Sequence, residues 1–190
     1  MAGSGRALRT ARLALRDFTS DDVDLLVGLD SDPQVMHFIT GGITTPRDEV
    51  VDDVLPAFLG YADRYEGYGF WAVEERSTGE FLGWFHLRPE ADHPQDEPEL
   101  GYRLRRTAWG QGFATEGSRA LIDAAFERWG ARRVVAFTMA AHPASRRVME
   151  KAGMRLVRAF TQEWPYRIPG EELGDVEYAI TRDEWDEGTA

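Results

Sequence analysis

The chain of 190 residues contains no cysteine and only one lysine. Without cysteine it cannot hold a disulfide framework, an iron–sulfur cluster, a thiolate zinc site or a cysteine nucleophile, a composition that is compatible with the cytoplasm. No apolar run approaches the roughly 20 residues of a membrane span. Residues 1–8 lack the apolar core of a signal peptide and are expected to form a flexible N-terminus, so we expect no membrane partner.

Basic side chains are also in deficit: 22 lysines and arginines stand against 33 acidic residues, a net charge of −11. Such a charge repels phosphate, so nucleic acid is not an expected partner, whereas a cationic substrate would be attracted. Solubility alone explains the acidity equally well. The hydrophobic fraction of 43% suits a packed globule, and we expect a single domain over residues 9–187.

The spacing of apolar residues changes along the chain between a period of two, typical of strands, and one of 3.6, typical of helices. The second helix, predicted over residues 46–65, contains Pro56, which should disturb it. The order is neither a βαβ repeat nor all-β, and predicts an α+β (mixed α/β) fold with one sheet of about seven strands covered by helices. Strands are predicted over 9–16, 70–75, 81–87, 99–104, 134–138, 155–162 and 176–181, and helices over 21–29, 46–65, 114–129 and 143–152.

The most informative stretch is residues 99–117, ELGYRLRRTAWGQGFATEG, which leads from a strand through a turn into a helix. Gly110 and Gly112 allow a sharp turn and close approach of a ligand to the backbone. The unpaired N–H groups and positive dipole of the helix start favour an anion, usually phosphate. A P-loop is excluded because no lysine lies here, and Thr115 stands where a dinucleotide fingerprint needs its third glycine. A turn that merely connects strand to helix remains the alternative.

The run WGQGFA, residues 109–114, resembles the coenzyme A motif of GNAT-type N-acetyltransferases. With residues 115–117 added, it resembles the subgroup related to ribosomal-protein alanine N-acetyltransferases (RimJ/RimL-like). The segments SRRVMEKAGMRL (145–156) and DVEYAITRDEW (175–185) resemble later parts of that subgroup in the same order. The resemblance implies a GNAT-like single domain with a twisted mixed sheet, helices on both faces and a splay between strands four and five. It also implies acetyl-coenzyme A as donor, no metal, and direct attack by a primary amine in a ternary complex.

The resemblance also implies how the donor binds. Its pyrophosphate would lie on main-chain N–H groups of the glycine turn, and its pantetheine arm along the end of the fourth strand. The N–H of Leu104 would polarise the thioester carbonyl, an oxyanion-hole role. The expected donor contacts are Leu104, Arg105, Arg106, Trp109, Gly110, Gln111, Gly112, Phe113, Ala114, Thr115, His142 and Ser145.

Two side chains are candidates for proton transfer. Glu99, at the start of the fourth strand, is the expected general base for the amine; the alternative is a solvated charge beside Glu97. Ser145 is the expected acid for the leaving thiolate, unless it only caps its own helix. His142 stands where the family usually has asparagine. An imidazole caps a helix poorly, but it can donate one N–H, serve as acid or base, or simply be structural.

Aromatic residues of the hairpin and of the last loop are expected to line the acceptor site, although each could belong to the core instead. These residues are Trp84, His86, Tyr102, Trp164 and Tyr166. The histidines lack metal-ligand spacing, so no metal is expected. The acceptor is a protein N-terminus or a small amine such as a polyamine or an aminoglycoside. A non-catalytic acyl-coenzyme A sensor stays open, and a homodimer is expected by analogy alone.

Overall fold

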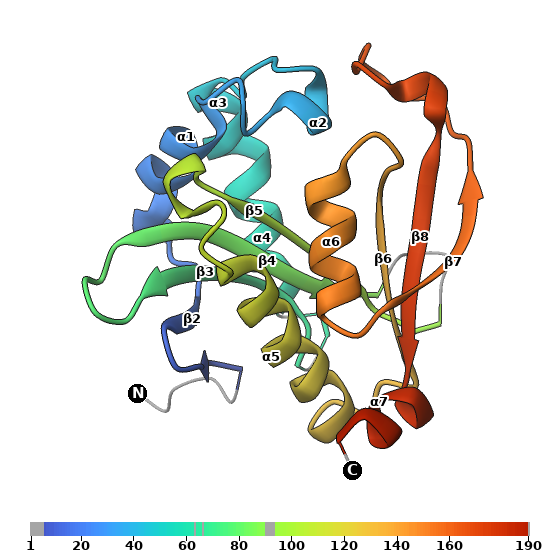
Figure 1. Cartoon of the computed structure of the whole chain (residues 1–190). Helices are drawn as coiled ribbons and strands as arrows, with labels where there is room; N and C mark the ends of the chain where they lie inside the picture. Colours follow the sequence, from blue (N-terminus) through green and yellow to red (C-terminus); the bar gives the residue numbers. More distant parts are fainter. Residues whose placement is uncertain (1–5, 63, 66, 90–93, 190) are drawn as a thin grey trace.

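The computed structural model describes residues 6–62, 64–65, 67–89 and 94–189. In these residues one mixed sheet of eight strands has the order β1-β2-β3-β4-β5-β6-β8-β7 (Figure 1). Its neighbours run antiparallel except β5 and β6. The mixed α/β class predicted from the sequence is thereby confirmed. The strands are β1 Leu8–Arg9, β2 Leu13–Asp17, β3 Gly69–Glu75, β4 Phe81–Arg88, β5 Glu99–Leu104, β6 Arg133–Met139, β7 Arg155–Phe160 and β8 Asp175–Thr181.

Helices cover both faces of the sheet. α5 and α6 lie on one face, and α1 and α4 lie on the other (Figure 1). The helices are α1 Val23–Asp30, α2 His37–Thr40, α3 Arg47–Glu49, α4 Leu55–Ala62, α5 Phe113–Glu127, α6 Pro143–Lys151 and α7 Arg182–Thr189. Short 3₁₀ turns cover Ser20–Asp22, Arg106–Ala108 and Glu171–Leu173, and a π-helical turn covers Val50–Val54.

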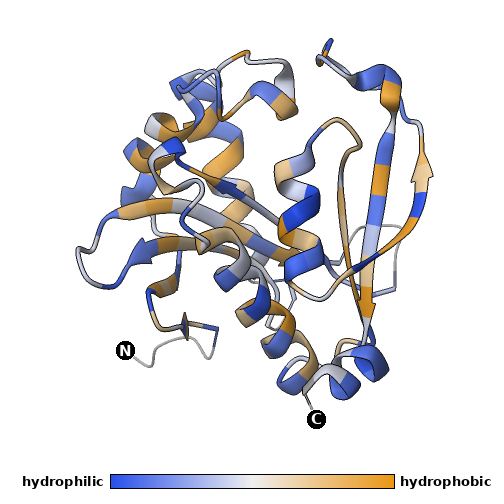
Figure 2. Cartoon of the chain, in the orientation of Figure 1, coloured by the Kyte–Doolittle hydropathy of each residue, from blue (hydrophilic) through white to orange (hydrophobic). Residues whose placement is uncertain are grey.

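The alternation of side chains along β3 separates two hydrophobic cores. Trp71 and Val73 belong to the core beneath α5, whereas Phe70 and Ala72 belong to the core beneath α1 and α4. Successive side chains of a strand point to opposite faces, so a sheet covered on both sides needs apolar residues at every position. Hydrophobic residues accordingly lie along the central strands and on the sides of the helices that face them (Figure 2).

β5 and β6 separate almost as soon as they meet. Within the described residues they share a single register pair, Glu99 with Val135, and Figure 1 shows β6 and β8 turning away from β4. The N–H of Arg105 donates to Leu82 on the β4 side. Since backbone groups alternate in direction along a strand, the N–H of Leu104 points toward the opening. The predicted splay between the fourth and fifth strands is confirmed; in the structure these are β5 and β6.

The predicted strand over 9–16 is wrong in one respect, because it consists of two strands. The N–H of Thr10 donates to the carbonyl of Leu13, and the N–H of Leu13 donates to Oγ1 of Thr10 at 2.8 Å. This turn folds β1 back on β2 and raises the strand number from seven to eight. A side-chain oxygen that competes for backbone donors is a common cause of such a turn.

The predicted helix over 46–65 is present as α3, the π-helical turn and α4 in succession. Pro56 in α4 lacks the N–H that an α-helix needs. The wider π turn comes directly before it, and the N–H of Leu55 donates to Val50. The proline therefore disturbs the helix, as expected, without ending it.

Part of the predicted flexible segment 1–8 lies outside the described residues, namely 1–5. Arg6 is buried, its guanidinium lies 2.6 Å from Asp17, and it donates to the carbonyl of Tyr68. Leu8 pairs with Leu15. In the described part of the chain, no helix combines the length and apolar character needed to cross a membrane.

Candidate active site

The turn between β5 and α5 has the backbone conformation that its two glycines permit. Gly110 has φ 72° and Gly112 has φ 83°, both in the left-handed region. Gly112 is the N-cap of α5, and its carbonyl accepts from the N–H of Glu116. The preceding N–H groups of the first helical turn have no partner inside the helix. They form a preorganised set of donors at the positive end of a helix of 15 residues.

Two residues that were predicted to contact acetyl-coenzyme A, Trp109 and Gln111, stabilise this turn with their side chains. The indole N–H of Trp109 donates to the carbonyl of Leu104 at 2.9 Å, and the amide of Gln111 donates to Thr107 at 2.7 Å. Trp109 thereby ties the glycine turn to the end of β5, where the splay opens, while the residue stays about half exposed. The main chain of this turn, more than these side chains, is arranged for a ligand.

The cations expected beside the turn already have partners. Arg106 lies 3.1 Å from Asp32, and Arg105 lies over the ring of Phe81. The side chain of Phe113 is buried beneath the guanidinium of Arg12, with 4.4 Å to the ring centroid. Phe113 could therefore bind a ligand only through its main chain.

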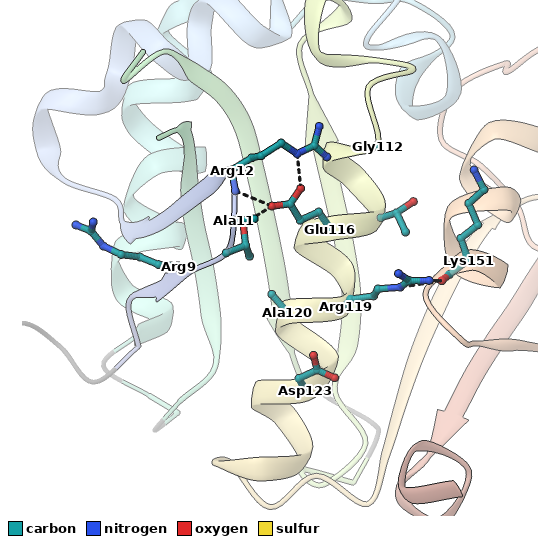
Figure 3. Close-up of a pocket in the computed structure, with 11 residues that line it drawn as sticks. Arg9, Ala11, Arg12, Gly112, Glu116, Arg119, Ala120, Asp123 and Lys151 are labelled. Atoms are coloured by element: carbon teal, nitrogen blue, oxygen red, sulfur yellow. Dashed lines mark hydrogen bonds and ion pairs between the residues drawn. The ribbon is translucent and has the colours of Figure 1, made fainter. Parts of the chain in front are cut away.

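A hollow of about 640 Å³ extends along the outer side of α5 from Gly112 (Figure 3). At its upper end the guanidinium of Arg12 lies 2.7 Å from the Glu116 carboxylate and donates to Gln111. Desolvation opposes ionisation of Glu116, but hydrogen bonds from Thr10 and Arg12 outweigh it and lower the pKa of its carboxyl.

On the α6 side of the hollow, Arg119 donates to the carbonyl of Lys151 at 3.0 Å (Figure 3). Gly112 and Thr115 also line this hollow and are among the predicted donor contacts, whereas the other lining residues are not. Sequence patterns do not reveal a contact such as that between Arg12 and Glu116, which lie 104 positions apart.

Glu99 lies where β5 and β6 part. Its neighbour on β4 is Arg88, whose guanidinium is 3.3 Å from Oε2 of Glu99. Nε2 of His86 is 3.8 Å from the same oxygen. The Glu99 side chain is 16% exposed, so it is not the solvated strand-end charge considered as the alternative. These three residues share the face of the sheet that α1 and α4 cover.

Ser145 and Tyr102 meet on the opposite face. Ser145 is buried in the first turn of α6, and its hydroxyl lies beside that of Tyr102. Burial raises the pKa of Tyr102, so the phenol stays protonated. Tyr102 packs against the core beneath α5. The structure thus places this predicted acceptor residue beside the predicted acid and away from Trp84 and His86.

Trp164 and Tyr166 lie at a third place. The indole N–H of Trp164 donates to Asp175 at 3.3 Å, and Tyr166 is 42% exposed. Both line a hollow of about 410 Å³ together with Arg167 and Glu171. The five residues predicted to bind the acceptor are therefore distributed over three sites.

His142 is the N-cap of α6 but forms no capping hydrogen bond with its side chain. Its ring stacks on Phe38 of α2, with 4.0 Å between centroids and 14° between planes. Burial, with a smaller contribution from His37, lowers the pKa of His142 to about 4. The ring is thus neutral at neutral pH and joins α2 to the start of α6.

The other end of α2 is also held in place. Gly41 follows it with φ 72°, and a Cβ there would come 2.3 Å from the carbonyl oxygen of Arg167. The segment around α2 therefore contacts both α6 and the 160–174 loop, beside the open end of the splay. Among the described residues, no three side chains gather as a metal site.

Comparison with known proteins adds to this geometry. A family model described as an acetyltransferase (GNAT) domain matches residues 12–155. The FsC-acetyl coenzyme A-N(2)-transacetylase of Aspergillus fumigatus is 36% identical over 94% of this chain and 77% of its own length. A GNAT-family acetyltransferase from Bacillus anthracis superimposes with a TM-score of 0.74 at 22% identity, over 93% of this chain and 99% of its own.

The structure of aminoglycoside acetyltransferase AAC(6′)-Ib with coenzyme A gives a TM-score of 0.73 at 17% identity, over 94% of this chain and 99% of its own. At these identities the two solved structures establish a shared fold. The family model and the similarity to the transacetylase show more than a shared fold, because they indicate membership of a protein family.

Proposed function

This chain belongs to the acetyltransferase (GNAT) family, and from that premise we propose that it transfers the acetyl group of acetyl-coenzyme A to a primary amine. The observation that carries the proposal is the splay between β5 and β6 beside the glycine turn of α5. The splay leaves main-chain groups of β5 without a neighbouring strand, and the turn presents N–H donors to an anion.

The chemistry of the residues present supports acetyl-coenzyme A as the donor. The donors of the α5 start suit a pyrophosphate, and the open edge of β5 suits the amides of the pantetheine arm. The N–H of Leu104 would then stabilise the oxyanion that develops on the thioester carbonyl. Arg119 and Lys151 line the hollow beyond Gly112 and would hold the nucleotide end.

Glu99 acts as the base in this proposal. The amine must lose a proton to attack the thioester, directly or through a water, and the Glu99 carboxylate lies at the vertex of the splay. Attack forms the C–N bond and breaks the C–S bond, and the thiolate takes a proton from the Ser145–Tyr102 pair. No covalent enzyme intermediate is needed, so the absence of cysteine carries no penalty.

The RimJ/RimL-like subgroup remains a proposal, supported by the segments 109–117, 145–156 and 175–185. It suggests a protein N-terminus as acceptor. The name of the Aspergillus fumigatus relative instead adds FsC as a candidate acceptor, and the net charge of −11 favours cationic amines. A cytoplasmic location and a homodimer remain predictions.

Thiol release from acetyl-coenzyme A tests the proposal, with a panel of FsC, peptides with free N-termini, polyamines and aminoglycosides. We expect turnover with at least one amine, confirmed by mass spectrometry of the acetylated product. Binding of acetyl-coenzyme A by calorimetry without turnover on any amine would favour the acyl-coenzyme A sensor instead.

The variant Glu99→Gln tests the base. We expect kcat to fall by about a factor of 100 to 10,000, with acetyl-coenzyme A affinity retained because Glu99 lies away from the glycine turn. The acidic limb of the pH profile of kcat/KM should disappear. An unchanged profile would remove Glu99 from this role.

A further inference from the structure

A buried histidine stands behind the Glu99 carboxylate. His86 on β4 faces Gly101 on β5 in the strand register, next to the pair formed by Arg88 and Glu99. Arg88 and His86 both approach Oε2 of Glu99, at 3.3 Å and 3.8 Å. Both side chains belong to β4, and both approach the same oxygen of the carboxylate.

The position of the His86 ring is fixed by its surroundings. Its face stacks on Trp84 at 5.7 Å between centroids and 24° between planes, and it meets Phe70 edge-on at 5.3 Å. A Cβ at Gly101 would come 2.6 Å from the ring. Any other residue at position 101 would push the imidazole away, so glycine here makes room for the ring.

The ring is also electrically neutral at neutral pH. Burial lowers the pKa of His86; Glu99 acts in the opposite direction, and Arg88 and Arg103 act with burial. Asp30 on α1 also faces this group of charges, paired with Arg103 at 2.5 Å. A neutral imidazole retains one N–H donor, and neither ring nitrogen forms a hydrogen bond within the described residues.

We propose that His86 is a positioning residue for Glu99, donating Nε2–H to Oε2 while Arg88 holds the same oxygen. The proposal rests on the role of Glu99 as base. The distance of 3.8 Å between Nε2 and Oε2 exceeds that of a good hydrogen bond by roughly 0.8 Å. Because the ring is fixed, rotation of the Glu99 side chain would close this gap. The proton of the amine goes to the Glu99 carboxylate and then to solvent. His86 forms and breaks no bond to the acceptor.

Two variants of His86 test the packing of its ring and the hydrogen bond of its nitrogen separately. His86→Phe keeps an aromatic ring against Trp84 and Phe70 but removes the donor, whereas His86→Gln keeps an N–H close to the place of Nε2. Phe58→Leu is the packing control, because Phe58 stacks on Phe70 and meets Trp84 without lying among the charged groups. The assay uses the most active amine of the panel, and thermal unfolding verifies the fold of each variant.

For His86→Phe we expect kcat to fall by about 10- to 100-fold, because a carboxylate misplaced by about 1 Å costs a reaction this much. The KM for acetyl-coenzyme A should stay constant, and the acidic limb of the kcat/KM profile should move. His86→Gln should recover most of the rate, and Phe58→Leu should lose stability but keep the profile. A folded His86→Phe with wild-type kcat and profile overturns the proposal.

Nitrogen NMR of histidine-labelled protein gives a result that needs neither an acceptor nor a folded His86→Phe. We expect the wild-type His86 signal to report a neutral ring with the proton on Nε2, and Glu99→Gln to shift the Nε2 resonance. An identical His86 spectrum in Glu99→Gln overturns the contact.

The role of Glu99 as base and the role of His86 in positioning it can be disproved separately. If Glu99→Gln keeps the wild-type rate and pH profile, the proposed base is wrong, and this inference falls with it. If Glu99→Gln loses activity while a folded His86→Phe does not, only the inference about His86 fails.

Discussion

At the scale of single residues, backbone conformation decides what the glycine turn can do. Gly110 and Gly112 were identifiable from sequence because their spacing before a helix is itself a chemical pattern. The environment of His86 was not, because its importance depends on Gly101 and Glu99 of the neighbouring strand, and pairing between strands cannot be read from one segment. For the same reason Tyr102 was grouped with Trp84, although alternation along the two strands places them on opposite faces.

Gly112→Ala is predicted to weaken acetyl-coenzyme A binding by about tenfold. An alanine at φ 83° is strained by about 1–2 kcal/mol, and its Cβ would lie 3.4 Å from the guanidinium of Arg12. Relief of this strain moves the N–H groups of the α5 start. Calorimetry measures the dissociation constant.

Gly79→Ala is the matched control, since Gly79 has φ 73° with open space around it. This variant should lose similar stability but keep the affinity for acetyl-coenzyme A. Equal affinities for both variants would contradict the prediction.

At the scale of elements, periodicity located the long strands and helices but missed the short ones. α2 has four residues, too few turns for a 3.6-residue pattern to emerge. α7 has eight residues, but Trp185 is its only large apolar side chain, so no apolar repeat marks it. The division of the first strand depends on one hydroxyl, that of Thr10. α2 matters most for the site, because Phe38 stacks on His142 and connects the acceptor side of the splay to the start of α6.

Phe38→Ala is predicted to loosen α2 without disturbing the glycine turn. Loss of the stack removes about 0.5–1.5 kcal/mol of ring interaction, in addition to buried area. Hydrogen exchange in residues 31–45 should accelerate, and the KM for the acceptor should rise several-fold while acetyl-coenzyme A affinity stays constant. Phe38→Tyr keeps the ring and should behave as wild type. Unchanged exchange in Phe38→Ala would show that the stack does not hold α2.

At the scale of the whole molecule, the splay is the feature that local patterns do not encode. Only the resemblance of residues 99–117 and later segments to a family predicts it, because the pairing of two distant strands such as β5 and β6 is not encoded in either segment. The same assembly buries groups that ionise readily. Asp22 and Glu177 have carboxyl pKa values lowered by arginine partners against the cost of desolvation, while His142 is held neutral by burial.

His142 makes the stability of the protein depend on pH in a defined window. Its folded pKa of about 4 lies below the ordinary value of 6.5. As pH falls from 6.5 toward 4, the unfolded chain therefore binds a proton that the folded chain refuses, and the free energy of unfolding decreases. His142→Asn removes this contribution and offers a better N-cap for α6.

We expect the wild type to lose about 2 kcal/mol more than His142→Asn across this window, a figure that includes solvent screening of a partly exposed ring. Urea unfolding at steps from pH 7 to pH 4.5 measures the difference. Loss of the stack on Phe38 shifts the His142→Asn curve equally at every pH, so only the slope matters. The depressed carboxyls and His86 titrate in both proteins and cancel. Parallel curves would show that the pKa of His142 is the same in the folded and the unfolded state.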